Sequence, residues 1–272
     1  MRKFIGVFSS AALLASLLAA ATAPSVGAVT CTPTGYWRDG INLTAAQIGG
    51  DVTVPLDATG CNIGVYYNAT NTGNVTGAEI YGANYFGVLV NGGNVNVTGS
   101  SIHDIGDSPL SGAQHGVAIY YATVVAGPDG SDADTDPDAM VCGGDGATSG
   151  TIDGNAIFAY QKGGIVANCA GTFVAIADNT VTGASSVSYI AQNGIQLGYH
   201  AAGSVTGNLI DGNSYTGSGW VATGLLLFDV SAKDIKASQN MYRNNQMNLV
   251  LVTDEACPSM YGGFYDTYGL CL

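Results

Sequence analysis

The sequence S-V-T-G-N-L-I-D-G-N at 204–213, followed by T-G-L-L-L-F at 223–228, decides the fold. Similar stretches occur at 150–167, as G-T-I-D-G-N-A-I-F-A-Y-Q-K-G-G-I-V-A, and from Val174, as V-A-I-A-D-N-T-V-T-G. Within each copy, aliphatic residues alternate with others at a period of two, which is typical of β-strands. Gly and Asn recur in phase between the strands, where tight bends favour them. One structural unit is therefore repeated, and such repeats bury their core by stacking on their neighbours.

The copies align on one position, which is occupied in turn by Ala78, Ser100, Asn155, Asn179, Asn208 and Asn240. The position three residues earlier is aliphatic, as Val75, Val97, Ile152, Ile176, Val205 and Ala237. The position two residues later holds Ile80, Ile102, Ile157, Val181, Ile210 and Tyr242. Each copy continues with a Gly-aliphatic-x-aliphatic strand, at 87–90, 116–119, 164–167, 194–197 and 224–227, with a final Asn-initiated strand at 248–251. We expect the consecutive Asn side chains to form a structural ladder, because amides stacked about 4.8 Å apart can hydrogen-bond to one another and to the bends.

This x-V-x-x-N-x-I…G-I-x-V turn resembles the right-handed parallel β-helix of the pectate-lyase-like superfamily, over about Thr53 to Thr253. The resemblance implies an all-β, single-stranded, right-handed parallel β-helix, a solenoid with an N-terminal cap and a C-terminal tail. The predicted organisation is a signal peptide at 1–28, a cap segment at 29–52 with a short amphipathic helix at 41–48, the β-helix at 53–253 with an insertion at about 121–149, and a disulfide-closed tail at 254–272. The fold alone implies no activity, since it hosts lyases, glycosidases, epimerases, adhesins and tailspikes.

The N-terminus predicts export. Arg2 and Lys3 precede an Ala- and Leu-rich run from Phe4 to Ala23, and Val26-Gly27-Ala28 suits a signal peptidase. We therefore expect cleavage after Ala28 and a secreted, extracellular protein, with an uncleaved membrane anchor as the alternative. No later apolar run approaches the roughly 20 residues that a bilayer requires, so we expect no membrane association after cleavage.

The charge and the cysteine content agree with the predicted extracellular location. Without Arg2 and Lys3, five basic residues face twenty acidic ones, a net charge near −15. A surface of this sign argues against nucleic acid and anionic membranes as partners. All six cysteines follow the signal peptide, and an even number in an exported chain indicates disulfides. Of the fifteen pairings that six cysteines allow, we expect Cys31–Cys61, Cys142–Cys169 and Cys257–Cys271, each closing one end or one excursion of the stack.

The insertion carries an acidic sequence, D-G-S-D-A-D-T-D-P-D at 129–138. Closely spaced carboxylates in a Gly-rich loop supply the hard oxygens that Ca²⁺ prefers. We therefore expect a calcium site formed by Asp132, Asp134, Asp136 and Asp138. The spacing matches part of an EF-hand loop but lacks its Gly and its distal Glu, and a solvated acidic loop is the alternative.

The turn before the insertion contains two of the three histidines, in H-D-I-G-D at 103–107 and Q-H-G at 114–116. A histidine near a carboxylate can act as a general acid or base toward a sugar. The candidate catalytic residues are therefore His103, Asp104, Asp107 and His115, and the candidate substrate-binding residues are Tyr120 and Tyr121. The alternative is that all are ordinary polar residues at bends. None of the active sites known in the superfamily transfers: the paired Asp with R-I-K of polygalacturonases and the D-P-H of alginate epimerases are absent.

Two outward faces differ in character. The outward positions of the Gly-aliphatic strands are largely apolar, namely Leu89, Ala118, Val166, Gln196, Leu226 and Val250. Contiguous apolar surface is usually covered, so we expect the tail or the insertion to cover it, with a homo-oligomer as the alternative. The strand before the Asn column presents Thr76, Thr98, Asp153, Ala177, Thr206 and Ser238. This polar row raises ice binding as a further alternative, although Asp153 and Ala177 interrupt the threonines.

Together these features predict a secreted protein that acts on an extracellular polysaccharide, in the manner of a lyase or epimerase and with calcium assistance. A glycosidase is a further reaction class that the fold allows. The alternative function is a non-catalytic surface or matrix protein that binds glycan or self-associates.

Overall fold

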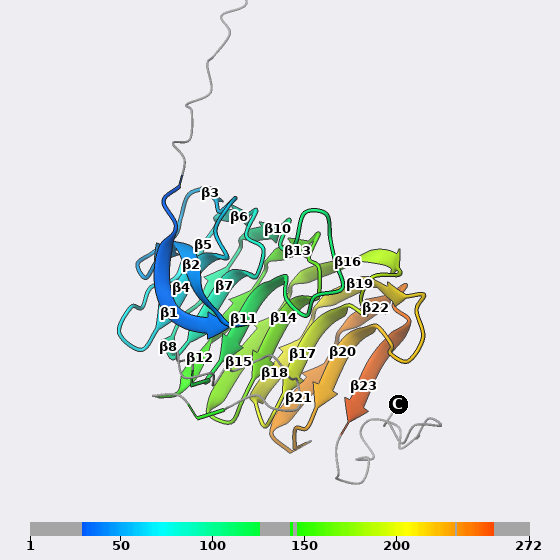
Figure 1. Cartoon of the computed structure of the whole chain (residues 1–272). Helices are drawn as coiled ribbons and strands as arrows, with labels where there is room; N and C mark the ends of the chain where they lie inside the picture. The colour runs from blue at the N-terminus through cyan, green and yellow to red at the C-terminus, as the bar shows by residue number, and fades with distance from the viewer. Residues whose placement is uncertain (1–28, 126–141, 144–145, 232, 253–272) are drawn as a thin grey trace, which may run out of the picture.

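The computed structural model describes residues 29–125, 142–143, 146–231 and 233–252. The regular secondary structure in these ranges consists of β-strands alone. The strands form three sheets, here named A, B and C (Figure 1). No helix in the described ranges is long and apolar enough to cross a membrane.

Sheet A contains nine strands in the order β1-β2-β4-β7-β11-β14-β17-β20-β23. They are β1 (Thr32–Arg38), β2 (Ile41–Ile48), β4 (Ile63–Asn68), β7 (Phe86–Asn91), β11 (Val117–Ala122), β14 (Gly163–Asn168), β17 (Asn193–Gly198), β20 (Thr223–Phe228) and β23 (Met247–Val252). Sheet B contains β5 (Val75–Thr76), β9 (Val97–Thr98), β12 (Thr148–Asp153), β15 (Thr172–Ala177), β18 (Ala202–Thr206) and β21 (Ile235–Ser238), with β8 (Gly93–Asn94) beside β12. Sheet C contains β3 (Leu56–Asp57), β6 (Glu79–Tyr81), β10 (Ser101–His103), β13 (Ala156–Phe158), β16 (Thr180–Val187), β19 (Leu209–Tyr215) and β22 (Met241–Arg243).

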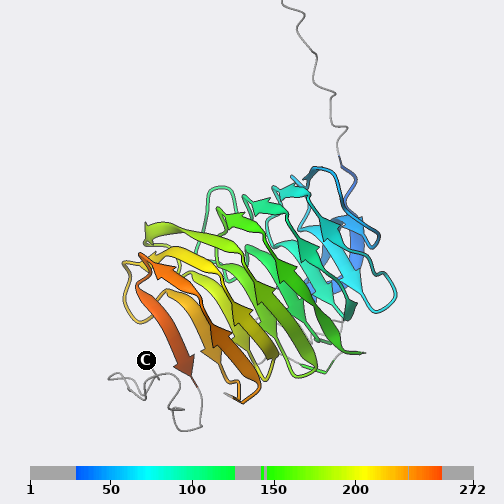
Figure 2. The same ribbon diagram turned by 180° about the vertical axis from the view of Figure 1, so that it is seen from behind.

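The chain visits the three sheets in turn. Strands β5, β6 and β7 belong to sheets B, C and A, and the same order recurs down to β21, β22 and β23. Each circuit of the chain therefore adds one parallel strand to every sheet, and Figures 1 and 2 show the three sheets enclosing a common interior. The all-β architecture of stacked parallel strands that the sequence predicts is confirmed.

The predicted columns are also confirmed on sheets B and C. Ile152 pairs with Val97 on one side and with Ile176 on the other, and Ile157 pairs with Ile102 and Val181. These aliphatic side chains are almost fully buried and form one continuous core. Because aliphatic side chains of successive circuits lie directly beside one another, each circuit buries its apolar face against the next.

The Asn column forms the predicted ladder. Asn179 Oδ1 accepts hydrogen bonds from Asn155 N at 3.0 Å and from Asn155 Nδ2 at 2.9 Å. The same pair of bonds joins Asn179 to Asn208 and Asn208 to Asn240. Ser100 N begins the series by donating to Asn155 Oδ1. The amides therefore satisfy backbone groups at bends that are buried from water.

One predicted register on sheet A is wrong. Gly116 was expected beside Gly87, but Ala118 pairs there, since Val117 pairs with Phe86 and Tyr120 with Leu89. Gly116 instead forms the bend before β11, at φ +82°, and a Cβ there would meet the Gln161 Cβ at 2.5 Å. Ala118, which was expected to point outward, packs in the inner core, while Tyr120 lies in the outer apolar cluster and Tyr121 in the core.

The predicted cap helix at 41–48 is also wrong, because these residues form β2. Leu43 and Ala45 are buried on one face of it at a period of two, as a strand requires. β2 pairs with β4 in parallel and with β1 antiparallel, which supplies partners for the backbone groups of β4 at the end of the stack.

Coverage of the apolar outer face comes in part from β1. Tyr36 makes edge contacts with Tyr66 and Phe86 at ring-centroid distances of 6.3 and 6.2 Å. Leu89 of the predicted outward column and Tyr120, which pairs with it, are at most 2 % exposed. The sequence prediction named the insertion or the tail as the cover and missed this N-terminal strand.

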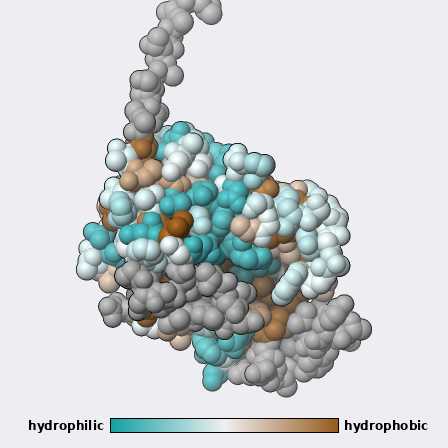
Figure 3. Space-filling view, in the orientation of Figure 1, coloured by the Kyte–Doolittle hydropathy of each residue, from teal (hydrophilic) through white to brown (hydrophobic). Residues whose placement is uncertain are grey.

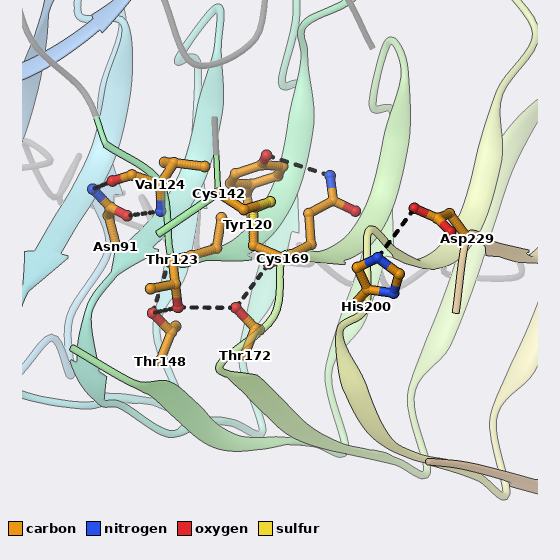
Figure 4. The surroundings of a disulfide bond; sticks show 12 residues. Asn91, Tyr120, Thr123, Val124, Cys142, Thr148, Cys169, Thr172, His200 and Asp229 are labelled. Atoms are coloured by element: carbon orange, nitrogen blue, oxygen red, sulfur yellow. Dashed lines mark hydrogen bonds and ion pairs between the residues drawn. A yellow bond between two sulfur atoms is a disulfide. The ribbon is translucent and has the colours of Figure 1, made fainter. Parts of the chain in front are cut away.

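Two of the predicted disulfides are confirmed, Cys31–Cys61 and Cys142–Cys169. Figure 4 shows the second one beside Tyr120, where it ties the described end of the insertion to the end of β14. Hydrogen bonds connect the hydroxyl of Thr123 to those of Thr148 and Thr172, at 3.0 and 3.2 Å. The predicted Cys257–Cys271 pair lies outside the described residues.

Candidate functional site

The candidate site is built on the long connection between β10 and β11, here called the rim loop (residues 106–116). The rim loop crosses the middle of the face seen in Figure 1, where Figure 3 shows hydrophilic residues gathered. It is anchored by the fully buried Gln161 of the next circuit. Gln161 Oε1 accepts from Asp107 N at 3.1 Å and from Ser111 N at 3.0 Å, while Nε2 donates to Ala113 O at 3.0 Å.

His115 lies at the end of this loop between two carboxylates. Its Nε2 is 2.8 Å from Asp107 Oδ1, and its Nδ1 is 3.8 Å from Asp39 Oδ2. The imidazole stacks on the Tyr85 ring with centroids 4.1 Å apart, and the side chain is 10 % exposed. The Ser111 hydroxyl donates to the other oxygen of Asp107. We call Asp39, Tyr85, Asp107, Ser111 and His115 the rim cluster.

The protonation state of the cluster follows from its contacts. Burial alone would raise the pKa of Asp107, but hydrogen bonds from Ser111 and His115 outweigh it and lower that pKa below its usual value. An ionised Asp107 can only accept, so His115 Nε2 carries a proton. Nδ1 is too far from Asp39 for a hydrogen bond, which leaves this nitrogen able to exchange a proton with a ligand.

Tyr85 is a neutral phenol in this setting. Burial raises its pKa to about 12, and a hydrogen bond with Asp39 and the charge of Asp39 act in the same direction. Asp39 lies at the turn between β1 and β2, at φ +51°. The neighbouring Arg38 Nη2 donates to Gln114 O, and its guanidinium lies 5.2 Å from the centroid of the Phe86 ring. The N-terminal hairpin therefore holds the rim loop in place.

The structure separates the predicted catalytic residues into two pairs. Asp107 and His115 lie together in the rim cluster, whereas His103 and Asp104 lie at the end of β10 on the outer face of sheet C. His103 Nδ1 is 2.7 Å from Asp104 Oδ2, and its Nε2 is 3.1 Å from Glu79 Oε1. With both nitrogens bonded to carboxylates, His103 has none left for a ligand.

The ring of His103 is covered as well. It stacks between Tyr81 and Phe158, at centroid distances of 5.5 and 4.7 Å and with nearly parallel planes. The Tyr81 and Phe158 rings cover the two faces of the His103 imidazole, so a sugar cannot stack on it. The column therefore has the character of a stabilising ladder on sheet C.

The predicted substrate-binding tyrosines are both buried. Tyr121 points into the core, fully buried, and its hydroxyl donates to Val95 O at 2.8 Å. Tyr120 is 2 % exposed under the outer apolar cluster, 5.0 Å from the Phe86 ring centroid. As placed, neither ring offers a face to a sugar.

The predicted calcium ligands, Asp132, Asp134, Asp136 and Asp138, lie outside the described residues. Within the described ranges, no group of three or more His, Cys, Asp or Glu side chains could hold a metal ion. The remaining histidine, His200, is exposed on the surface, with Nε2 3.6 Å from Asp229 Oδ2 (Figure 4).

Sequence reasoning missed Asp39, Tyr85 and the anchoring glutamine. Asp39 and Tyr85 come from other circuits, and nothing in the sequence marks their approach to His115. The sequence does contain a signal for Gln161, because a glutamine also precedes the next Gly-aliphatic strand: Gln161 is three residues before Gly164, and Gln192 is two residues before Gly194. Gln192 is also fully buried, and its Oε1 accepts from Ala184 N at 2.9 Å. A buried amide before a strand therefore marks a position that bonds a neighbouring segment, which is a loop for Gln161 and β16 for Gln192.

The chain matches no family model, no curated protein and no solved structure.

Proposed function

We propose that this is an exported, right-handed, single-stranded parallel β-helix protein that acts on an extracellular polysaccharide. The sheet order, the disulfides Cys31–Cys61 and Cys142–Cys169, and the acidic composition support export and the solenoid. The handedness and the pectate-lyase-like affinity rest on the resemblance of the repeated turn. The expected calcium site at 132–138 remains part of this proposal.

The observation that carries the proposal is the placement of His115 between Asp107 and Asp39, just before β11 of sheet A. Asp107 fixes the Nε2 proton, so Nδ1 is the basic nitrogen, and Tyr85 supplies a neutral phenol beside Asp39. Such a set can remove a proton from a sugar carbon and return one, as lyases and epimerases do. His103 and Asp104 are reassigned from this chemistry to a structural role.

The experiment is an activity screen on uronic-acid and neutral polysaccharides, with and without Ca²⁺. We expect turnover of at least one polymer, a loss of at least about 100-fold in His115→Ala, and near-wild-type activity in the matched control His103→Ala. No turnover on any polymer, or equal activity in His115→Ala and the wild type, would contradict the catalytic proposal.

A second candidate is a non-catalytic glycan-binding or self-associating matrix protein. It is favoured by the commitment of nearby cations to backbone carbonyls: Arg38 donates to Gln114 O, and Lys162 Nζ donates to Ala191 O at 2.9 Å. Glycan binding without turnover would support this candidate. For self-association through the outer apolar column, a solution mass above that of one chain is the expected result.

A further inference from the structure

A second polar surface lies on the outer face of sheet B, on different strands from the rim cluster. It is a shallow trough of about 620 Å³ that crosses the first circuits of the sheet. Two columns of outward side chains form its walls. One wall consists of Asp51, Asn74, Asn96 and Thr151, and the other of Thr53, Thr76 and Thr98.

The first wall is fixed before any ligand binds. Asp51 Oδ1 accepts from Asn74 N, and Asn74 Oδ1 accepts from both the backbone and the side-chain nitrogen of Asn96, all at 3.0 Å. Asn96 Oδ1 accepts from Thr151 N at 3.0 Å. Side chains held in this way lose little freedom when they bind, which favours recognition.

Hydrogen-bonding capacity remains along both walls. Within the described residues, the Asn74 side-chain nitrogen and the hydroxyls of Thr53 and Thr151 make no hydrogen bond, and Thr76 and Thr98 are joined by one long contact of 3.5 Å. Hydroxyls both donate and accept, as sugar hydroxyls do. The walls therefore complement a ligand rich in hydroxyl groups.

The lining also defines the charge of that ligand. Among the described residues that line the trough, Asp51 is the one ionisable side chain and none is basic. The carboxylates of a polyuronate would be repelled by Asp51 with no basic residue to compensate, whereas a neutral polymer loses no binding free energy to charge repulsion.

An exposed aromatic ring extends the same face. Phe173 on β15 pairs with Ser149 and lies on the same face as Ala175, the partner of Thr151 in the trough wall. Phe173 is 60 % exposed. A flat apolar ring beside a row of hydroxyls and amides is the combination that binds the apolar face of a sugar while fixing its polar edge.

We propose that the outer face of sheet B, from Asp51 to Phe173, binds a neutral, hydroxyl-rich polysaccharide chain. The trough crosses four strand positions, so it extends about 14 Å along the stack and accommodates several sugar units. The proposal shares with the proposed function only the class of ligand, because binding here requires no chemistry at His115.

The test is affinity electrophoresis and calorimetry with a soluble β-glucan, a xylan and a mannan, beside polygalacturonate and alginate, on protein made without N-glycosylation. We expect the wild type to bind at least one neutral polymer. Phe173→Ala and the double variant Thr76→Val/Thr98→Val should each weaken that binding at least about fivefold with unchanged melting temperature. The matched controls are Trp220→Ala, in the exposed connection between β19 and β20, and Thr206→Val, on sheet B outside the trough, and both should bind as the wild type does.

Failure to bind any neutral polymer, binding restricted to polyuronates, or equal affinity in the trough variants and the controls would each overturn the proposal. His115→Ala keeps the two proposals apart. Loss of turnover with retained binding supports both sites, whereas retained binding without any turnover in the wild type removes the rim chemistry and leaves the trough.

Discussion

At the scale of single residues, side-chain amides satisfy the backbone groups that the bends would otherwise leave buried and unpaired. Asn179 shows this most fully, since it is 1 % exposed and bonds both neighbours in its ladder. Its Nδ2 also donates to Ile152 O at 2.9 Å. Removing one such amide leaves several buried polar groups without a hydrogen-bond partner, and each unsatisfied group lowers the stability of the fold.

Asn179→Ala should therefore be strongly destabilising. The Asn155 amide and the Ile152 carbonyl would lose their partner, at about 1–3 kcal/mol each, so we expect a loss of about 4 kcal/mol in the free energy of unfolding. Urea denaturation measures this. Asn240→Ala is the matched control, because Asn240 is partly exposed at the end of the ladder, and an equal loss in both variants would contradict the ladder's cooperative role.

Lys162 is a residue where burial costs stability. Burial lowers the pKa of its ammonium to about 8. Between pH 8 and the unfolded-state pKa near 10.5, the unfolded chain binds more protons, so the stability of the native protein rises with pH across that window.

Lys162→Met should consequently be more stable than the wild type at pH 7, by about 2 kcal/mol after loss of the bond to Ala191. The advantage should disappear above about pH 10.5. Denaturant titrations at pH 7 and pH 10.5 measure the difference, with the exposed Lys233→Met as control. A pH-independent difference would show that burial of the charge is not its cause.

At the scale of elements, glutamines of the following circuit fix two of the long connections between sheets C and A, those between β10 and β11 and between β19 and β20. Gln161 anchors the rim loop, and Gln246 Oε1 accepts from Tyr215 N and Ala222 N at 3.2 and 2.9 Å. The same residue type thus repeats its task three circuits further along the stack. Loops that vary in length between circuits can in this way keep a defined conformation.

Gln161→Ala should release the rim loop while leaving the sheets intact. We expect hydrogen exchange of the Asp107 and Ser111 amides to accelerate by at least about 10-fold, because both lose their acceptor. Gln246→Ala is the matched control and should accelerate exchange at Tyr215 and Ala222 instead. Unchanged protection at Asp107 and Ser111 in Gln161→Ala would contradict the anchoring role.

The rim loop should also respond to acid through Asp107. Because the pKa of Asp107 is lowered in the native state, its contribution is complete above the unfolded value near 3.9 and is lost as pH falls through the lower native pKa. Asp107→Asn should lack this acid-dependent step. Urea unfolding from pH 7 to pH 3 should therefore show the gap between wild type and variant closing, and a gap that stays constant would exclude Asp107 as its source.

How far the sequence predicts these elements depends on whether a signal repeats. The aliphatic columns of sheets B and C and the Asn ladder recur in phase, and the sequence places them correctly. The β11 register fails because Gly116 belongs to a bend, and β2 was mistaken for a helix because its apolar positions fit both periods. The rim cluster could not be derived as a whole, since Asp39 and Tyr85 reach His115 through tertiary contacts alone.

At the scale of the whole molecule, the stack is nearly one-dimensional, because each strand pairs with those directly before and after it in its sheet. In such an arrangement the stability of one end depends little on contacts at the other. The N-terminal hairpin β1–β2 is joined to the stack by pairing with β4 and by the Cys31–Cys61 bond. That hairpin also carries Asp39 and covers part of the apolar outer face.

Removing this disulfide should therefore loosen one end and affect the candidate site without unfolding the remainder. In Cys31→Ser/Cys61→Ser, the loss of a cross-link between residues 30 positions apart should cost about 3 kcal/mol locally. Hydrogen exchange should rise in β1 and β2 and stay protected in β17, β20 and β23, and any turnover that depends on His115 should fall while binding to the sheet B trough persists. Uniform loss of protection along all the strands would instead mean that the stack unfolds as a single cooperative unit. The hairpin would then stabilise the whole stack and not only its N-terminal end.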